Sequence, residues 1–347
     1  MWVMMKRVLW GGLLLLLCLA APGASEVVLP AVGTVLGTRV NMRAEPSTSA
    51  SVLLRFSGGE LVEVLEKAPE KSGDQYPWYR VTMNDSTGWV YGQYLAVDKA
   101  LPRFALASLD GSKVLLLQRP LMETIAPRFT RCIFNGVLHS VTFEDYRTES
   151  QKWNGRETAR TFDDLAGFLF RVEGKPLSLP YGDPVGSDVL LVDDEYTGSV
   201  EPIPLKKSPA EATPDQRKAF EKRYGRTLKA IVRIAEAEDS GVAVYAMEFK
   251  PKGKNALAAI ALVAPEGTFC LDFPAAYDEQ STWHVDDGGE FYPESYIVGS
   301  LLKRGDGYEF TLHDASAESF TSRLVVTTGG KLVESPVTSS ARYIVPE

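Results

Sequence analysis

The sequence predicts a mainly β protein, with a small antiparallel barrel near the N-terminus and a strand-rich region after it. Three observations support this fold class. Short apolar runs recur along the whole chain, Gly, Pro, Asn or Asp residues separate most of them, and only two stretches carry helix signals. The strand-rich region is therefore expected to form a meander, a sandwich or a partial barrel with one or two short helices.

The small barrel is predicted from residues 34–97. Valine, leucine and aromatic residues occur there in five short runs that are separated by polar loops. The Asp-Ser-Thr-Gly segment at 85–88 is expected to be a tight turn between two strands. Trp78 and Trp89 are predicted to fill the core. Closing five strands into a barrel would remove the exposed edges that such strands otherwise present.

The same segment carries a series of landmarks in a fixed order. They are Asn41-x-Arg43, Pro46-Ser47, a glycine before Glu60, Trp78-Tyr79-x-Val81, Gly88-Trp89-Val90 and Tyr94-Leu95. In order and spacing they resemble the bacterial SH3 (SH3b) domain over residues 31–97, roughly a fifth of the chain. The resemblance implies a non-catalytic module, here placed at 31–98, that binds peptidoglycan or its stem peptides, or packs against a partner domain of the same chain.

Four tyrosines are the candidate ligand-binding residues, because tyrosine combines a stacking face with a polar tip. They are Tyr76, Tyr79, Tyr91 and Tyr94. Asn41 and Arg43 are further candidates, with the alternative that the asparagine bonds the loop backbone and the arginine lies along the barrel. Residues 31–97 contain six basic and seven acidic side chains, so binding is expected to depend on shape, stacking and hydrogen bonds.

Residues 1–25 are typical of a secretory signal peptide. Lys6 and Arg7 precede an apolar run over 8–21, and small residues follow at 22–25. The run is too short to span a bilayer, so no transmembrane segment is expected after cleavage. Cys18 is followed by more apolar residues, which disfavours lipidation. We therefore expect an exported protein of the periplasm, the extracellular space or the cell envelope.

The charge balance restricts the partners. The chain has 37 basic and 45 acidic side chains, a net charge of −8, and removal of Lys6 and Arg7 leaves 35 against 45, or −10. An acidic chain is a poor match for nucleic acid or for an anionic membrane surface. The expected partners are peptidoglycan or its stem peptide, or another envelope protein.

The sequence contains no recognisable catalytic or metal-binding motif. Its three histidines, His139, His284 and His313, are far apart, and no zinc-ligand spacing is present. The acidic clusters at 193–195 and 286–290 lack the alternating ligands of a calcium loop and are predicted to be solvated turns. No catalytic residue, metal or cofactor is expected.

A divergent cell-wall hydrolase or peptidase is the alternative function, with its catalytic region within 101–347. Cys270 would then be the nucleophile and His284 the base. Cys132 is less suitable because it leads into a hairpin and does not open a helix. Cys132 and Cys270 are equally compatible with one disulfide and with buried thiols. In a third interpretation, the SH3-like unit packs on the remaining chain through Tyr76, Tyr79 and Tyr94 and binds nothing else.

Residues 101–347 are predicted to be rich in strands, with an internal break at 201–213 where prolines cluster. Asp110-Gly111 and Asn135-Gly136 each predict a hairpin. A short helix is expected in the first half of 161–170. Eight further strands are predicted at 228–235, 242–249, 256–263, 268–273, 296–302, 308–312, 323–327 and 331–333.

The clearest helix signal lies just after the proline-rich break. Thr213 is a hydroxyl cap, Pro214 occupies the first helical position, and Gln216 completes a capping box. Ala219, Phe220 and Tyr224 give the helix one apolar stripe, and Gly225 can end it.

Overall fold

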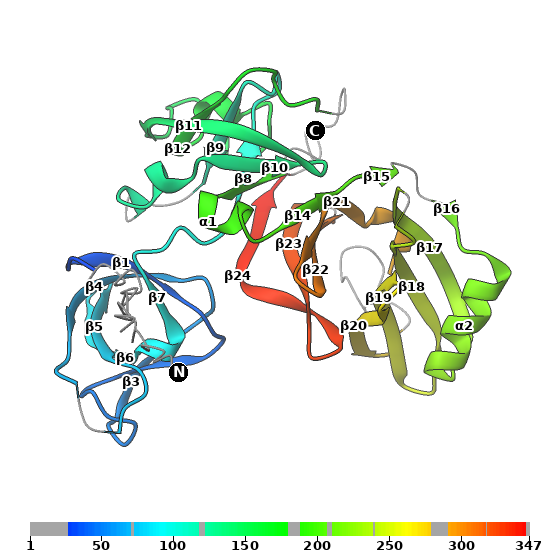
Figure 1. Ribbon diagram of the computed structural model, residues 1–347, viewed down its shortest axis with the longest axis horizontal. Helices are drawn as coiled ribbons and strands as arrows, with labels where there is room; N and C mark the ends of the chain where they lie inside the picture. Colours follow the sequence, from blue (N-terminus) through cyan, green and yellow to red (C-terminus); the bar gives the residue numbers. More distant parts are fainter. Residues whose placement is uncertain are drawn as a thin grey trace, which may run out of the picture.

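The computed structural model describes residues 27–70, 73–117, 122–179, 188–206, 210–238, 240–278, 291–316 and 318–344. The protein is mainly β, as predicted (Figure 1). The expected signal peptide, the acidic cluster at 286–290 and His284 lie outside the described residues. No helix in the described ranges is long and apolar enough to cross a membrane.

The N-terminal unit is a seven-stranded antiparallel sheet in the order β3-β2-β6-β5-β4-β1-β7. Its strands are β1 (Ala31–Val35), β2 (Val40–Arg43), β3 (Val52–Phe56), β4 (Leu61–Lys67), β5 (Trp78–Met83), β6 (Ser86–Tyr91) and β7 (Leu95–Val97), with the 3-10 turn η1 (Gly92–Tyr94) before β7. Every strand contributes to one core, which is mostly valine and also contains Met42 and Phe56. The sheet therefore curls around a single core (Figure 1).

Several details of this unit differ from the prediction. It has seven strands instead of five, and among the described residues no ladder joins β3 to β7, so side-chain packing closes the small barrel. The tight turn lies at Asn84-Asp85, because Ser86 already begins β6, and Asn84 has a φ of 52°. Trp89 is half-buried and lies outside the core, since its neighbour Val90 points inward and successive strand residues alternate.

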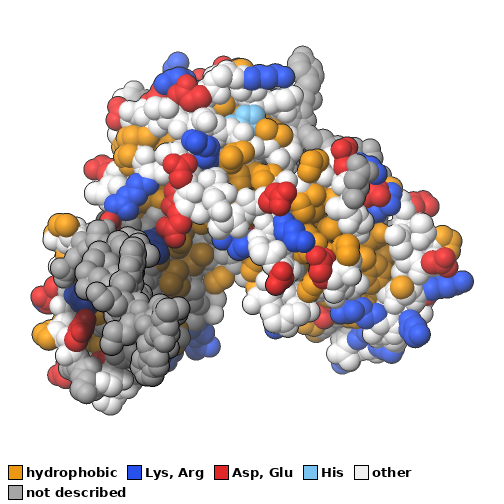
Figure 2. All heavy atoms as spheres, viewed as in Figure 1, with side chains coloured by type: hydrophobic (Ala, Val, Ile, Leu, Met, Phe, Trp, Pro, Cys, Tyr) orange, Lys and Arg blue, Asp and Glu red, His pale blue; other side chains and the backbone are white. Residues whose placement is uncertain are grey.

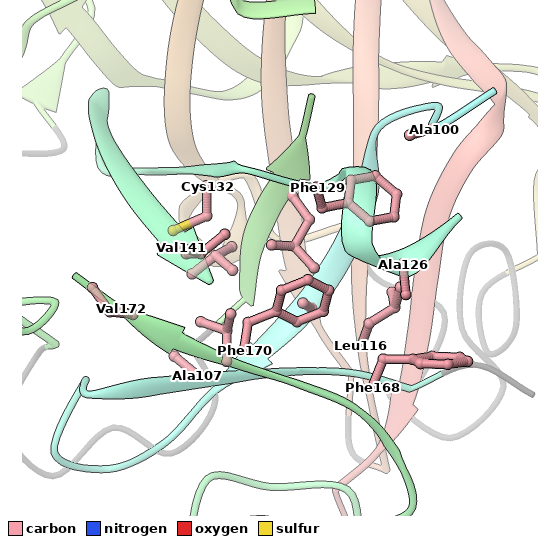
Figure 3. Close-up of a cluster of buried hydrophobic side chains, with 14 of the residues drawn as sticks. Ala100, Ala107, Leu116, Ala126, Phe129, Cys132, Val141, Phe168, Phe170 and Val172 are labelled. Carbon is pink, nitrogen blue, oxygen red and sulfur yellow. The ribbon is translucent and has the colours of Figure 1, made fainter. Parts of the chain in front are cut away.

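A closed six-stranded barrel follows, in the order β10-β11-β12-β9-β8-β13. Its strands are β8 (Arg103–Ala107), β9 (Lys113–Leu116), β10 (Arg131–Phe134), β11 (Val137–Arg147), β12 (Gly167–Val172) and β13 (Asp188–Val192), with 3-10 turns η3 (Ala126–Arg128) and η4 (Phe162–Asp164). Phe129, Phe168, Phe170 and Cys132 fill its interior (Figure 3).

The two hairpins predicted in the barrel are present, whereas the short helix predicted in the first half of 161–170 is not. Asn135 and Gly136 have φ values of 51° and 72° and connect β10 to β11, and Asp110-Gly111 connects β8 to β9. The expected short helix is only the 3-10 turn η4, and β12 follows it. The acidic cluster at 193–195 is not a plain turn, because Asp193 caps the four-residue helix α1 (Asp194–Thr197) by accepting a hydrogen bond from Tyr196 N at 2.8 Å.

The remaining strands form two sheets that share one core. One sheet contains β14 (Glu201–Ile203), β21 (Ile297–Arg304), β22 (Gly307–Ala315), β23 (Ser319–Thr328) and β24 (Lys331–Tyr343), preceded by the turn η5 (Pro293–Ser295). The other contains β15 (Leu205–Lys206), β16 (Ala210–Glu211), β17 (Leu228–Ala237), β18 (Ala243–Lys252), β19 (Asn255–Ala264) and β20 (Gly267–Ala276). Leu262 from one sheet and Phe310 from the other lie in the shared core.

The eight strands predicted between 228 and 333 correspond to β17–β24. The last of them is longer than predicted, because β24 continues through Pro336 to Tyr343. In the described parts of the proline-rich stretch at 201–213, β14 pairs with β21, while β15 and β16 pair with β17 in the other sheet. Figure 2 shows hydrophobic side chains gathered over these two sheets on the visible face.

Helix α2 (Pro214–Tyr224) lies against the second sheet and has the predicted ends. Thr213 Oγ1 accepts from Gln216 N at 3.3 Å, and Gln216 Oε1 accepts from Thr213 N at 2.8 Å, which is a complete capping box. Gly225 ends the helix with a φ of 58°. Phe220 is buried, whereas Ala219 is exposed and does not belong to the apolar stripe.

The N-terminal sheet packs on the six-stranded barrel and on β24. Val32 and Leu61 contact the core of the barrel. Arg103, which is buried in β8, donates from Nη2 to Thr34 Oγ1 at 3.0 Å and from Nη1 to Val337 O at 2.8 Å. One side chain therefore connects the N-terminal sheet, the barrel and β24.

Candidate functional site

Three of the four predicted tyrosines lie together beside a tryptophan in the N-terminal sheet. The ring centroids of Tyr76 and Tyr91 are 5.8 Å apart with an interplanar angle of 83°, and those of Tyr91 and Tyr94 are 6.5 Å apart. The ring centroid of Trp78 is 5.2 Å from that of Tyr91. We call Tyr76, Trp78, Tyr91 and Tyr94 the aromatic cluster.

The local backbone fixes this arrangement. Tyr91 ends β6 directly opposite Trp78, and its hydroxyl accepts a hydrogen bond from Tyr76 N at 3.2 Å. Gly92 N donates to Pro77 O at 2.7 Å. A Cβ atom at Gly92 would lie only 2.7 Å from Pro77 O, so the close approach of these two segments requires glycine.

The aromatic cluster has a buried floor and accessible edges. Trp78 is 4% exposed, whereas Tyr76 is 38% and Tyr94 is 44% exposed. A pocket of about 190 Å³ lies next to Tyr76, and its lining includes Glu70 and Asp74. Aromatic faces beside carboxylates can stack on an apolar ligand surface and accept hydrogen bonds from its hydroxyl or amide groups.

The other three predicted site residues lie elsewhere. Tyr79 packs against the core of the N-terminal sheet. Asn41 Oδ1 accepts from Arg55 Nε at 3.2 Å, a bond to the neighbouring strand and not to the loop backbone that was expected. Arg43 Nη1 donates to Ala50 O at 2.7 Å, which holds the loop after β2. These contacts are structural, and a ligand-binding role for the three residues stays a prediction.

Trp78 is buried, as predicted, but it lies outside the cluster of core residues that contains Val81. We predicted it for the core together with Val81, yet residues three apart in a strand lie on opposite faces. Val81 is in the core, so Trp78 is on the other face, where it lines the pocket beside Tyr76. The strand parity of these two residues was the signal that could have identified it.

The two thiols of the described chain are free and far apart in the fold. Cys132 lies opposite His139 in the β10–β11 hairpin, but burial raises the pKa of its thiol to about 12. It is therefore protonated at neutral pH, whereas nucleophilic attack needs the thiolate. Cys270 is half-buried in β20, and its proposed partner at position 284 lies outside the described residues.

A buried polar chain lies between the barrel and the sheet of β21–β24. His313 Nδ1 bonds Ser322 Oγ at 2.8 Å, and Ser322 Oγ donates to Asp188 Oδ2 at 2.5 Å. Serine is in the middle, whereas a catalytic triad has histidine between the nucleophile and the carboxylate. Burial lowers the pKa of His313 to about 4. In the described part of the chain, no group of three or more His, Cys, Asp or Glu residues could hold a metal ion.

The comparison with protein families agrees with the landmarks and the sheet. The family model described as bacterial SH3 domain matches residues 38–96. This segment is a bacterial SH3 domain. The matched span begins just before β2 and contains the whole aromatic cluster, so the predicted resemblance is confirmed. No curated protein and no solved structure matches the chain. Bacterial SH3 domains are typically binding modules, and many of them bind cell-wall components.

Proposed function

We propose that this chain is an exported cell-envelope protein whose SH3 domain binds peptidoglycan or its stem peptide through the aromatic cluster. A second envelope protein is the other ligand class for the same surface. The observation that carries the proposal is that Tyr76 and Tyr94 are exposed while the SH3 domain packs on the remaining chain through other residues.

The packing surface and the aromatic cluster are formed by different residues. Val32, Thr34 and Leu61, from β1 and β4, contact the barrel, and Gly58 lies against Pro336 of β24. If the domain served only to pack on the chain, its tyrosines would be expected in that contact. Their exposure supports an external ligand.

The chemistry of the aromatic cluster fits a wall fragment. Tyrosine rings can stack on the C–H face of a sugar or on an apolar peptide side chain, and the hydroxyls can bond its polar groups. Glu70 and Asp74 add hydrogen-bond acceptors beside Tyr76. The near balance of six basic and seven acidic side chains in residues 31–97 favours contact by stacking over long-range attraction.

We also infer that the SH3 domain, at 31–98, is a separate folding unit and that the following chain divides again at 201–213. The SH3 domain, the six-stranded barrel and the two facing sheets each have a main hydrophobic core, which supports this division, and smaller contacts join them, as where Leu190 of the barrel clusters with Leu302 of the sheet. Export is inferred from the basic, apolar and small-residue pattern of residues 1–25.

Sedimentation of the full chain with purified peptidoglycan tests the binding site. The double variant Tyr76→Ala/Tyr94→Ala is expected to bind at least tenfold more weakly, because each tyrosine ring that packs on the ligand buries apolar surface worth about 1 kcal/mol or more, and about 1.4 kcal/mol corresponds to tenfold in affinity. Tyr277→Ala is the matched control, since Tyr277 is 41% exposed but lies outside the SH3 domain. Equal retention of the wild-type chain and the double variant would refute the assignment.

A zymogram on cell-wall substrate tests the proposed absence of catalysis. The wild-type chain and Cys270→Ala would be compared on the same gel. We expect no clearing from either. Clearing by the wild type that is lost in the variant would favour the hydrolase instead.

A further inference from the structure

A cleft of about 820 Å³ lies between the SH3 domain and the six-stranded barrel, and it contains no residue of the aromatic cluster. The SH3 domain lines it with Gly59, Glu60, Leu61, Glu63, Thr82, Met83 and Asn84, and the barrel with Leu117, Tyr146, Glu149, Trp153, Glu157, Leu165 and Ala166. The proposed peptidoglycan site does not require this cleft, so its role is a separate question.

The charged residues that line the cleft are all acidic. Glu60 and Glu63 lie on one wall and Glu149 and Glu157 on the other, and no lysine or arginine is among its described lining residues. Neighbouring Arg147 does not line the cleft: its Nε donates to the backbone O of the lining residue Leu165 at 3.0 Å, and its Nη1 lies 3.6 Å from the Asp163 carboxylate, which offsets its charge. Four carboxylates without a lining cation give the cleft a negative potential that attracts cations.

The described carboxylates of the cleft do not form a metal site. Within the described residues no three acidic, histidine or cysteine side chains converge as metal ligands. A compact ion such as Ca²⁺ needs six to eight oxygen ligands within about 2.6 Å. Separated carboxylates on two facing walls are matched better by an elongated ligand that carries its positive charges some distance apart.

Two aromatic rings add a second kind of cation contact. Trp153 is 38% exposed, and its Nε1 donates to Arg156 O at 3.2 Å, which restrains the indole. Tyr146 is held by Phe168, whose ring centroid is 4.9 Å away. An ammonium group over a tryptophan or tyrosine face is attracted by the ring quadrupole.

The cleft also offers apolar surface for the chain that links such charges. Leu61, Met83, Leu165 and Ala166 are also among its lining residues. Methylene groups can pack there while their charged ends contact the carboxylates. The Arg103 bridge to Thr34 and the packing of Val32 hold the walls together, so the cleft is formed before any ligand arrives.

We propose that this cleft binds an extended alkylammonium ligand, which is either a free polyamine or the lysine side chains of a peptide. The carboxylates pair with the ammonium groups, Trp153 and Tyr146 contact one of them by cation–π interaction, and the apolar residues pack against the methylene chain. Both sources present the same chemistry, and the experiment distinguishes them.

Calorimetric titration of the full chain with spermidine and with trilysine tests the proposal, with chitotetraose as the neutral probe. We expect spermidine, trilysine or both to bind, and the affinity to fall as salt is raised. Glu63→Gln is expected to weaken binding about threefold, as for a partly exposed ion pair. Trp153→Ala is expected to weaken it about fivefold through the lost cation–π contact.

Glu66→Gln is the matched control, because Glu66 is on the same strand as Glu63 but pairs with Arg80 at 3.2 Å outside the cleft. Binding of spermidine alone identifies a free polyamine, and binding of trilysine alone identifies a peptide. The proposal is overturned if neither binds at millimolar concentration, if only chitotetraose binds, or if Glu66→Gln weakens binding as much as Glu63→Gln. Because peptidoglycan sedimentation depends on Tyr76 and Tyr94, the two proposals can fail independently.

Discussion

Arg342 and Asp188 form a buried ion pair that joins β24 to β13 of the barrel. Arg342 Nε lies 2.7 Å from Asp188 Oδ1, and the two side chains are 2% and 1% exposed. Ser322 Oγ also donates to Asp188, while Arg342 Nη1 donates to Glu157 O and its guanidinium lies 5.1 Å from the Phe320 ring centre. This pair therefore holds the C-terminal strand on the barrel.

Replacing the arginine by methionine tests how much the pair contributes. Arg342→Met keeps most of the volume but leaves the Asp188 carboxylate buried without its counter-charge. Breaking a buried pair in this way costs about 3–5 kcal/mol in the free energy of unfolding. The double variant Arg342→Met/Asp188→Asn should be more stable than Arg342→Met alone, because asparagine can still bond Ser322 and carries no charge.

Two measurements together give the size of the effect. Urea unfolding followed by circular dichroism gives the shift in stability. Maleimide labelling of Cys132, resolved by peptide mass spectrometry, reports opening of the barrel, because this thiol is fully buried in the barrel core. If labelling follows the open population, a loss of about 3 kcal/mol should accelerate it by roughly a hundredfold or more.

Two results would contradict this account. One is a loss of less than about 1 kcal/mol in Arg342→Met, the value of an exposed ion pair. The other is a double variant that is less stable than Arg342→Met. That result would show that the charge of Asp188 is not what destabilises the single variant. If labelling of Cys132 stays slow while the urea midpoint falls, the region that the substitution destabilises lies outside the barrel.

Three further changes have defined outcomes. Burial lowers the pKa of His313 to about 4, so between about pH 6.5 and 4 the unfolded chain protonates this imidazole and the folded chain does not. The free energy of unfolding therefore falls as the pH is lowered through this range. His313→Gln should remove about 3 kcal/mol of that fall, measured by urea midpoints at several pH values. Thr213→Ala removes a helix cap and should cost about 1 kcal/mol, seen as faster amide exchange in the first turn of α2. Gly92→Ala places a Cβ atom against Pro77 and should destabilise the SH3 domain by about 1–3 kcal/mol, measured by thermal unfolding.

Each of these changes has a control or an opposing result. His139→Gln should leave most of the pH dependence, because His139 is only half-buried; an unchanged slope in His313→Gln would contradict the assignment. If amide exchange becomes faster throughout both α2 and β17, the effect of Thr213→Ala is not confined to the lost helix cap. Gly37→Ala controls for Gly92, since its Cβ would meet only ordinary contacts of 3.4 Å or more, and the two variants should differ in thermal midpoint.

Features set by neighbouring residues could be predicted from the sequence. The Asn135-Gly136 hairpin needs two residues with positive φ, and this dipeptide supplies them. The α2 capping box requires only Thr213 and Gln216, which are three positions apart. In both cases the physical cause lies within a few residues, so no knowledge of the remaining fold was required.

The candidate site could be predicted only in part. The landmarks identified the SH3 domain, and three of the four tyrosines lie in the aromatic cluster. Tyr79 was named because its residue type alone suggested recognition; it lies apart from the aromatic cluster and packs against the core of the domain. Residue type suggests what a side chain can contact, whereas strand parity and the covering loop decide which face it occupies.

The contacts that leave the aromatic cluster free were beyond prediction, because they join residues that are very far apart in the sequence. Arg103 bonds Val337, 234 positions away, and Arg342 bonds the backbone of Glu157, 185 positions away. Pro336 interrupts the last strand, so the sequence after Val333 does not read as a continuing strand, yet β24 runs on to Tyr343. This second half of β24 contacts both the SH3 domain and the barrel. Through Pro336, which lies against Gly58, it helps to set which face of the SH3 domain is covered.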